Sequence, residues 1–372
     1  MNILIVSKVL YPNNSPRGFR TTELVKELCR QGHSVTLYIV KESPVQQEIA
    51  SEFGFELKDL GPTKLKPIED IIKSKNRDNL FIRGIRRLLL LFFEYPEIEL
   101  MFKVKSCLSK ENDYDLLISI AVPHPIHWGV AWARTRNHQI AKTWVADCGD
   151  PYMGNRMDSF KKFFYFRYFE KWFCKKADYI SVPAPDYIQY YYKEFHYKFR
   201  VIPQGFKFED SKIFKGEIIN DVPTFAFAGR FLKQIRDPRP LLDLLVEINH
   251  PFKFVVFTPD VEFLKPYEEK LGHKLENKGF VKREDLLYEL SKMDFLLHIE
   301  FHPSVKSNSP SKFADYYIAN RPVLALNMEN PEKDKIIDFL NKDYSKKMDL
   351  SDADKFQIEN VVRQFISLIK ND

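Results

Sequence analysis

Short apolar runs alternate with amphipathic segments along the first 205 residues. Asn2–Ser7 is apolar throughout, as expected of a parallel strand that is buried on both faces. A helix is predicted over Phe19–Arg30, Gly32 ends it, and Ser34–Val40 is predicted to be the second strand. Further strands are predicted at Asp115–Ala121, Ala141–Asp147, Ala177–Val182 and Phe199–Ile202. The pattern predicts a doubly wound parallel α/β sheet over residues 1–205.

Residues 206–223 are polar and charged without clear periodicity, which indicates a linker, and a second alternation follows. Strands are predicted at Thr224–Ala228, Phe252–Thr258, Lys274–Gly279, Asp294–Ile299 and Pro322–Leu326. Helices are predicted between them at Pro240–Asn249, Val261–Leu271 and Arg283–Lys292. Residues 224–350 are therefore expected to form a second Rossmann-like domain. The final segment, residues 351–372, is predicted to be one amphipathic helix over Ser351–Lys370 that packs across the junction between the domains.

Composition narrows the class of protein. Of 372 residues, 44% are hydrophobic and 29% are charged, which is typical of a folded globular protein. The four cysteines form no CxxC pair and no zinc-ligand spacing, so free thiols in a reducing compartment are expected. We expect no signal peptide at the start, and no apolar run reaches the roughly 18–20 residues of a membrane span. These features indicate a cytoplasmic protein, and a net charge of +6 is too small to indicate a nucleic-acid partner.

The stretch Lys306–Tyr317, a polar loop that leads into a short helix, carries the first candidate chemistry. Ser309 is a good N-cap, and Pro310 suits the first helical position. The unpaired N–H groups of a first turn attract anions, and Lys312 adds a cation. Asp315, one turn after Ser311, can accept hydrogen bonds from ribose hydroxyls. The residues predicted to hold a nucleotide diphosphate here are Ser307, Asn308, Ser309, Ser311, Lys312 and Asp315. An ordinary capped surface helix is the alternative.

Motifs in a fixed order resemble those of glycosyltransferase family 4. Ser15–Arg20 and Gly32–Val35 resemble the family's glycine-rich loop and the end of the helix after it. Val201–Phe206 resembles the V-I-P-N-G segment that closes the first domain. Ala228–Arg236 resembles the G-R…K-G loop, and Ser309–Val323 resembles the P-x-K…E/D-Y…G-x-P-V helix. The resemblance covers nearly the whole chain and implies the GT-B fold, two Rossmann-like α/β domains that face each other across a cleft.

The resemblance also implies a chemistry. Members of the family are mostly retaining enzymes that use sugar nucleotides and stabilise the departing diphosphate without a bound metal. At the matching positions, Arg230, Arg236 and Lys312 would hold the diphosphate, and Gly18 would contact the donor. No cofactor is expected besides the nucleotide-diphosphate sugar itself. Arg236 replaces a family lysine, and its fork can bind a diphosphate. Ser307 replaces a family glutamate and cannot supply that residue's charge.

Two loops of the first domain follow predicted strands at their carboxyl ends, where α/β sheets bind ligands. His124 lies between two prolines in the first loop, and the resemblance implies that it lines the donor-sugar or acceptor site. Asp150, in the second loop, can orient an acceptor hydroxyl or act as a base. Asp147 is expected to face the same cleft, and His127 is predicted to lie on the helix that follows. The alternatives are an incidental loop histidine and a turn aspartate before proline.

Two Asp-x-Asp patterns occur, at residues 113–115 and 352–354. In metal-dependent glycosyltransferases such a pair ligates the divalent ion that holds the diphosphate. Here the first pattern precedes a predicted strand and the second caps a predicted helix. Both are predicted to be structural, and no metal is expected.

Arg77–Phe93 and Phe160–Lys176 mix basic residues with bulky apolar ones. Such stretches can seat a protein on an anionic membrane surface. The alternative is a pair of core-facing helices with basic outer faces. Stacking on nucleic acid is a third interpretation, but neither stretch resembles such a module. A membrane contact would place the protein at the inner face of the membrane, with a lipid-linked sugar or a growing cell-surface polysaccharide as acceptor.

The sequence therefore predicts a glycosyltransferase that moves a sugar from a nucleotide-diphosphate donor to a glycan or lipid-linked acceptor. Synthesis of cell-surface polysaccharide or lipopolysaccharide is the expected context. One alternative is a non-catalytic nucleotide-sugar-binding subunit, which Ser307 favours. Another is a GT-B sugar-nucleotide epimerase, which would use more carboxylates around the sugar than the sequence offers.

Overall fold

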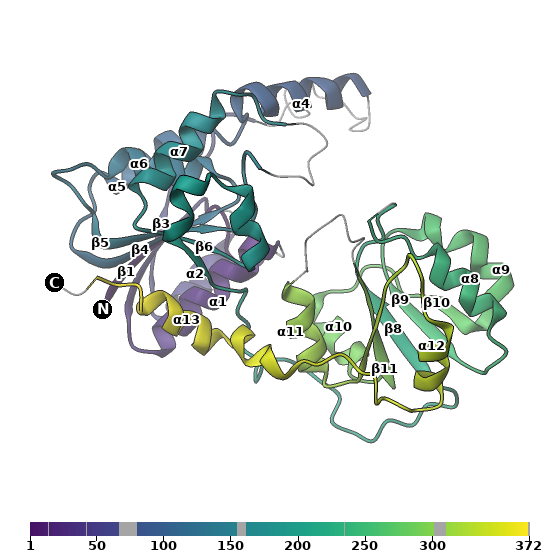
Figure 1. Ribbon diagram of the computed structural model, residues 1–372. Helices are drawn as coiled ribbons and strands as arrows, with labels where there is room; N and C mark the ends of the chain where they lie inside the picture. The colour runs from purple at the N-terminus through teal and green to yellow at the C-terminus, as the bar shows by residue number, and fades with distance from the viewer. Residues whose placement is uncertain are drawn as a thin grey trace. The chain divides into compact units, whose positions relative to one another are not determined.

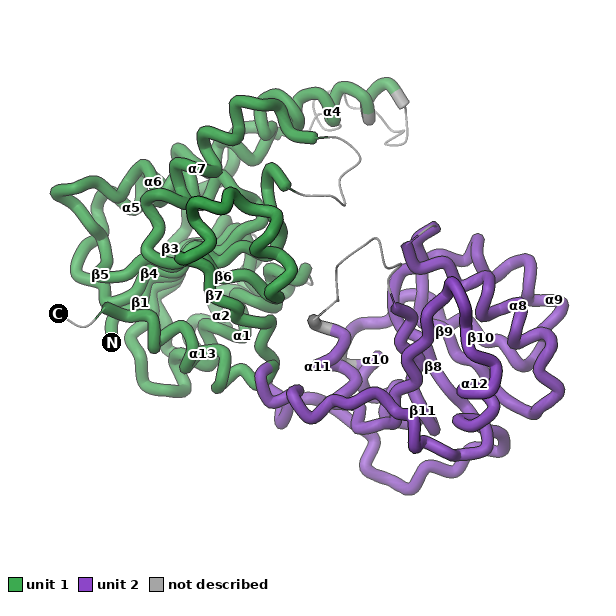
Figure 2. Tube along the Cα trace, viewed as in Figure 1, with its two compact units in different colours: residues 1–206, 356–372 green, residues 207–355 purple. Residues whose placement is uncertain are grey.

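A computed structural model describes residues 1–13, 15–41, 43–66, 80–154, 161–233, 235–300 and 310–370. The chain divides into two compact units (Figure 2). Unit 1 comprises Met1–Phe206 with Phe356–Asp372, and unit 2 comprises Lys207–Lys355. Each is built around one parallel sheet.

Unit 1 has a seven-stranded sheet in the order β3-β2-β1-β4-β5-β6-β7, with every pair of strands parallel. Its strands are β1 (Asn2–Val6), β2 (Ser34–Ile39), β3 (Glu56–Asp59), β4 (Tyr114–Ala121), β5 (Ala141–Cys148), β6 (Tyr179–Val182) and β7 (Phe199–Val201). The strand order reverses between β1 and β4. In doubly wound sheets, ligands bind beyond the carboxyl ends of the strands at this switch point.

Helices cover both faces of the unit 1 sheet (Figure 1). One face carries α5 (Glu99–Leu108), α6 (Pro125–Ala133) and α7 (Phe166–Lys176), and the other carries α1 (Pro16–Arg30), α2 (Pro44–Phe53) and α13 (Ile358–Ile366). Leu4 and Val6 belong to the first core, whereas Ile3 and Ile5 belong to the second. Because successive side chains point to opposite faces, a strand buried on both sides is apolar throughout.

Unit 2 repeats the plan with a five-stranded parallel sheet in the order β10-β9-β8-β11-β12. Its strands are β8 (Thr224–Ala228), β9 (Lys253–Phe257), β10 (Leu275–Asn277), β11 (Phe295–Ile299) and β12 (Val323–Leu326). Its helices are α8 (Arg239–Glu247), α9 (Lys265–Leu271), α10 (Arg283–Leu290), α11 (Pro310–Ala319) and α12 (Lys333–Leu340). The order reverses between β8 and β11. The two sheets confirm the predicted α/β class with two Rossmann-like domains.

The C-terminal segment differs from the single predicted helix. Ser351–Phe356 forms a 3₁₀ turn, and α13 begins only at Ile358. Between them Gln357 is extended and forms a bridge with Phe206, whose N–H donates to the Phe356 carbonyl at 2.9 Å. This pairing stops a continuous helix. Helix α13 then packs on α1 in unit 1. None of the helices in the described ranges is long and apolar enough to span a bilayer.

Candidate functional site

Two cationic side chains of unit 2 lie at the carboxyl end of β8. Gly229 follows that strand with φ +141°. A Cβ built on Gly229 would overlap the Lys312 ammonium and lie 3.7 Å from Nη1 of Arg236. Glycine is therefore required for Lys312 to approach the backbone here. Because the strand order reverses between β8 and β11, this point is the topological switch point of unit 2.

The charged groups of both side chains are buried. The Lys312 side chain extends from α11, and its Nζ has no hydrogen-bond partner among the described residues. Nζ lies 4.5 Å from the centre of the Phe227 ring. Burial, and then the neighbouring Arg236, hold the pKa of Lys312 well below its usual range. Arg236 is only 4% exposed, and burial lowers its pKa as well. Placing two like charges together in a buried position is unfavourable, and a bound anion would relieve it.

Arg230 is held in a different way. Its Nε donates to Oδ2 of Asp260 at 2.8 Å, and its Nη2 lies 2.5 Å from Oδ1. Asp260 also accepts the N–H of Phe231 at 2.8 Å. The Arg230 side chain is nevertheless 67% exposed. The Asp260 carboxylate thus orients a guanidinium that can still contact a ligand.

Asp315 lies on α11 and forms an ion pair with Arg283 at the start of α10. Nε and Nη2 of Arg283 donate to Oδ1 at 3.1 and 2.7 Å, and neither bond uses Oδ2. Burial raises the pKa of the Asp315 carboxyl, although Arg283 acts in the opposite direction. Sequence reasoning missed both Arg283 and Asp260, because the pairs join residues 32 and 30 positions apart.

Residues 301–309, which precede α11, lie outside the described residues. The helix begins at Pro310, as predicted. Ser307, Asn308 and Ser309 lie outside the described residues, as does the side chain of Ser311. Their predicted roles at the nucleotide site stay predictions.

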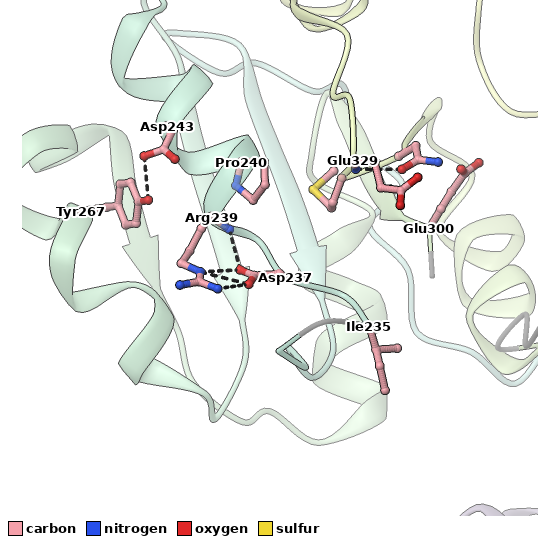
Figure 3. Close-up of a pocket in the computed structure, with 10 residues that line it drawn as sticks. Ile235, Asp237, Arg239, Pro240, Asp243, Tyr267, Glu300 and Glu329 are labelled. Carbon is pink, nitrogen blue, oxygen red and sulfur yellow. Dashed lines mark hydrogen bonds and ion pairs between the residues drawn. The ribbon is translucent and has the colours of Figure 1, made fainter. Parts of the chain in front are cut away.

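A cavity of about 370 Å³ opens at the carboxyl ends of the strands of unit 2 (Figure 3). The sequence analysis did not predict it. Its lining comes from the loop after β8, from α8 and α9, and from the segments after β11 and β12. The lining residues are Ile235, Asp237, Arg239, Pro240, Asp243, Tyr267, Glu300, Asn327, Met328 and Glu329. Arg239 is paired with Asp237, and Tyr267 donates to Asp243 at 2.7 Å. Carboxylates, an amide and a phenol are groups that hydrogen-bond hydroxyl-rich ligands.

In unit 1, Asp147 lies near the carboxyl end of β5 and is fixed by hydrogen bonds and ion pairs. Arg20 donates to it from Nε at 3.1 Å and from Nη2 at 2.8 Å, and Ser181 donates at 2.7 Å. Arg17 adds a contact at 3.4 Å. Burial alone would raise the pKa of Asp147, but Arg20 and Arg17 hold it below its usual range. Asp147 therefore anchors the N-terminus of α1 to the sheet.

Gly18 and Gly149 allow this close packing. A Cβ on Gly18 would overlap the carbonyl oxygen of Asn13, and a Cβ on Gly149 would overlap the Arg17 guanidinium. The Gly18 N–H donates to the N-cap Ser15 at 3.1 Å. The Ser15–Arg20 motif contained the signal for Arg17 and Arg20, although neither was predicted as a site residue.

His124 and Asp150 lie together beyond the ends of β4 and β5. The backbone of Asp150 is hydrogen-bonded to His124, and the Asp150 side chain is exposed. His124 is 3% exposed, and its Nε2 has no partner among the described residues. Burial, then His127, hold the pKa of His124 well below its usual range, so the ring is neutral. Its ring centre lies 4.8 Å from that of Tyr152.

His127, by contrast, is part of the core. It lies on α6 and contacts Ser119 at 2.8 Å and Cys148 at 3.4 Å. Burial lowers its pKa to about 3. Of the first Asp-x-Asp pattern, Asp115 accepts the N–H of Asn2 at 2.9 Å, while Asp352 lies in the 3₁₀ turn before α13. Among the described residues, no three His, Cys, Asp or Glu side chains gather as metal ligands would.

No protein-family model matches the sequence, and no curated protein does. Solved structures do match along the full length of the chain. A glycosyltransferase from Rickettsia africae ESF-5 has a TM-score of 0.63 at 12% identity, covering 100% of this chain and 99% of its own. HepE of Anabaena, in complex with UDP and glucose, has a TM-score of 0.59 at 10% identity, with 99% and 98% covered. This is the GT-B fold.

The GT-B match also includes the lipopolysaccharide outer core galactosyltransferase WaaB in its apo form. That structure has a TM-score of 0.57 at 12% identity, with 99% of each chain covered. At such low identities the matches establish the fold, and they confirm the fold that the sequence motifs implied. Membership of family 4 itself stays a prediction.

Proposed function

We propose that this GT-B protein is a glycosyltransferase that moves a sugar from a nucleotide-diphosphate donor to a glycan or lipid-linked acceptor. The observation that carries the proposal is the pair of buried cations, Lys312 and Arg236, at the switch point over Gly229. Negative charge builds on the diphosphate as it leaves the sugar, and fixed cations in a buried site stabilise that charge strongly. HepE, a fold neighbour, has been solved with UDP and glucose, which agrees with such a donor.

In this proposal the side chains of unit 2 hold the donor. Lys312, Arg236 and the exposed face of Arg230 bind the diphosphate, together with the first turn of α11. Asp315 accepts a ribose hydroxyl through Oδ2, while Arg283 fixes its Oδ1. The reaction proceeds without a metal and with retention at the sugar carbon. Both features come from the family resemblance.

The acceptor is assigned to unit 1. Neutral His124 can hydrogen-bond a sugar or acceptor hydroxyl through Nε2. The exposed Asp150 carboxylate can orient the attacking hydroxyl. We further propose that the protein works in the cytoplasm at the inner face of a membrane, in synthesis of cell-surface polysaccharide or lipopolysaccharide. WaaB, a lipopolysaccharide galactosyltransferase of the same fold, supports that context.

A thermal-shift panel tests the donor site. UDP, GDP, ADP, CMP and their common sugar conjugates are added to the protein, each with and without EDTA. A ligand at 100 times its Kd stabilises the folded protein by about 2.7 kcal/mol, which shifts the midpoint visibly. We expect one nucleoside diphosphate to stabilise the protein equally with and without EDTA. No shift with any nucleotide would refute the assignment of Lys312, Arg236 and Asp315.

Two substitutions separate an enzyme from a nucleotide-sugar-binding subunit. His124→Ala and Asp150→Ala each remove an acceptor-side group and leave the unit 2 residues intact. We expect both variants to keep the nucleotide-induced shift and to lose sugar transfer, measured as release of the nucleoside diphosphate with a glycan or lipid-linked acceptor. A binding subunit would show no transfer before or after the change.

A further inference from the structure

Helix α4 (Leu80–Phe93) is mostly apolar. Its Ile82 is buried, but none of its described residues lies in the two large core clusters of unit 1. Phe81 and Leu88 are two turns apart and so share one face, and they are 73% and 55% exposed. Phe93, at the end of the helix, is 62% exposed. Arg86 is exposed on the opposite side. The helix runs outward from the body of unit 1 (Figure 1). It is amphipathic, and Phe81 and Leu88 on its apolar face are exposed to solvent.

The residues just before and within α7 extend this apolar surface. The rings of Phe92 and Phe163 lie 4.6 Å apart, which joins the two segments. Phe164 and Tyr168 are 60% and 57% exposed, and Arg167 lies 4.8 Å from the Tyr168 ring. The aromatic–basic surface is defined here as Phe81, Leu88, Lys161, Phe163, Phe164, Arg167 and Tyr168.

The charged side chains that α4 and residues 161–176 expose at the surface are all positive. Helix α4 contains no acidic residue. Residues 161–176 contain one, Glu170, which is fully buried. Glu94, directly after α4, is buried and forms an ion pair with Lys162 at 2.5 Å. The charged side chains that these segments expose are therefore cations, including Lys161 and Arg167.

We infer that the aromatic–basic surface docks on an anionic lipid bilayer. Helix α4 would lie in the plane of the headgroups, with Phe81 and Leu88 at the edge of the acyl chains. Lys161 and Arg167 would contact lipid phosphates. Large aromatic side chains beside cations suit this boundary, because the rings leave water while the charges stay at the headgroups.

Charge decides between this partner and a second copy of the chain. Two copies that met through this surface would bring cations against cations across an apolar contact, which is unfavourable. A bilayer that contains anionic lipid complements the same pattern. The inference rests on the proposed function and extends it, because docking would bring the protein within reach of a lipid-linked acceptor in the membrane. The residues of this surface are separate from those of the donor site.

Vesicle co-sedimentation of the full chain tests the inference. The vesicles contain phosphatidylcholine alone, or phosphatidylcholine with phosphatidylglycerol. We expect binding only to the anionic vesicles, and weaker binding at 1 M salt than at 0.1 M, because the Debye length falls from about 10 Å to about 3 Å. Phe81→Ala with Leu88→Ala should weaken binding at least about tenfold. Arg167→Gln should weaken it about fivefold.

Ile219→Ala is the matched control, because Ile219 is 82% exposed but lies in unit 2. This variant should bind vesicles as the unaltered protein does. Nucleotide-induced thermal shifts report folding and the donor site in every variant, so a failed donor assignment is told apart from a failed membrane assignment. The inference is wrong if the unaltered protein binds neither vesicle. It is also wrong if the double variant binds like the unaltered protein, or if sedimentation velocity shows a dimer that this variant dissociates.

Discussion

Unit 1 and unit 2 each bury a cation at the carboxyl edge of a parallel sheet, but they treat its charge differently. Arg20 in unit 1 is 2% exposed and has two hydrogen bonds to the Asp147 carboxylate. The Lys312 ammonium in unit 2 has no hydrogen bond or ion pair among the described residues, and Arg236 lies beside it. A buried charge with its counter-charge is part of the fold. The Asp315 carboxylate raises the pKa of Lys312, but by less than burial and Arg236 lower it. The ammonium is therefore not fully compensated, and a bound anion would stabilise it.

Glu170 is a third case, a buried carboxyl that forms no ion pair with any described residue. It accepts the N–H of Met153 at 3.3 Å, and burial raises its pKa to about 7. A buried carboxyl can stay neutral by keeping its proton. The Lys312 amine can become neutral by losing a proton. Arginine cannot, because its pKa stays above any working pH. Arg236 therefore keeps its charge beside Lys312, and that charge attracts a bound anion.

The largest expected effect comes from breaking the pair in unit 1. Arg20→Met leaves Asp147 buried with less compensation, so the free energy of unfolding should fall by about 3–5 kcal/mol. Urea denaturation measures the loss. Lys171→Met is the control, because Lys171 forms an exposed pair with Glu194 at 3.1 Å, and such pairs contribute about 0–1 kcal/mol. Equal losses in the two variants would contradict the structural role of the Arg20 pair.

The next largest expected effect is a pH dependence of the free energy of unfolding, caused by Glu170. The folded protein holds the Glu170 proton up to a pKa of about 7, above the ordinary value of 4.5. The stabilisation is complete below the ordinary pKa and is lost as pH rises through the folded one. Raising the pH from about 5 to about 8 should therefore reduce the free energy of unfolding by roughly 3 kcal/mol through this group.

Glu170→Gln should remove that part of the pH dependence, because glutamine stays neutral. The measurement is the difference between the unfolding free energies of the variant and the unaltered protein at each pH. Glu194→Gln, at an exposed position in the same unit, should follow the unaltered protein. A variant difference that stays constant with pH would show that Glu170 does not titrate in this range.

Lys312→Met tests the other half of the comparison. Removing a buried ammonium without a partner should leave the unfolding free energy of the ligand-free protein unchanged or higher, in contrast to Arg20→Met. The stabilisation by the best nucleotide, about 2.7 kcal/mol at 100 times its Kd, should largely disappear. Lys253→Met is the control, because Lys253 forms a half-exposed ion pair with Glu276. This variant should keep the nucleotide-induced stabilisation. A Lys312→Met variant as unstable as Arg20→Met would mean that the ammonium has a structural partner.

Sequence reasoning recovered the parts of the fold that have a local signal. β1, β4 and β11 were found because strands buried on both faces are apolar along their whole length. β3 was missed, since Glu56–Asp59 is a half-exposed edge strand with hardly any apolar residues. The break at Gln357 was missed because it depends on a bridge to Phe206, far away in the sequence.

The candidate site shows the same limit. The motifs identified four candidate site residues, Arg230, Arg236, Lys312 and Asp315. They did not show whether the charge of each is paired in the folded protein. Whether a charge is paired depends on partners that only the fold brings near, such as Asp260 for Arg230. The sequence could not tell the satisfied Arg20 from the unsatisfied Lys312, although both lie in recognisable motifs.

The smallest expected effect sharpens the comparison within unit 2. Arg230→Gln removes an exposed partner of Asp260, which still accepts the Phe231 N–H at 2.8 Å and the Thr258 hydroxyl at 3.3 Å. The unfolding free energy should therefore fall by less than in Arg20→Met, because Arg230 is 67% exposed and solvent screens its pair with Asp260. The nucleotide-induced shift should decrease, but less than in Lys312→Met, because solvent screens an exposed cation more than a buried one. Both quantities come from the same thermal-shift and urea measurements. If Arg230→Gln lost the larger part of the nucleotide shift, exposure would not govern how strongly each cation holds the diphosphate, and Arg230 would be the principal contact.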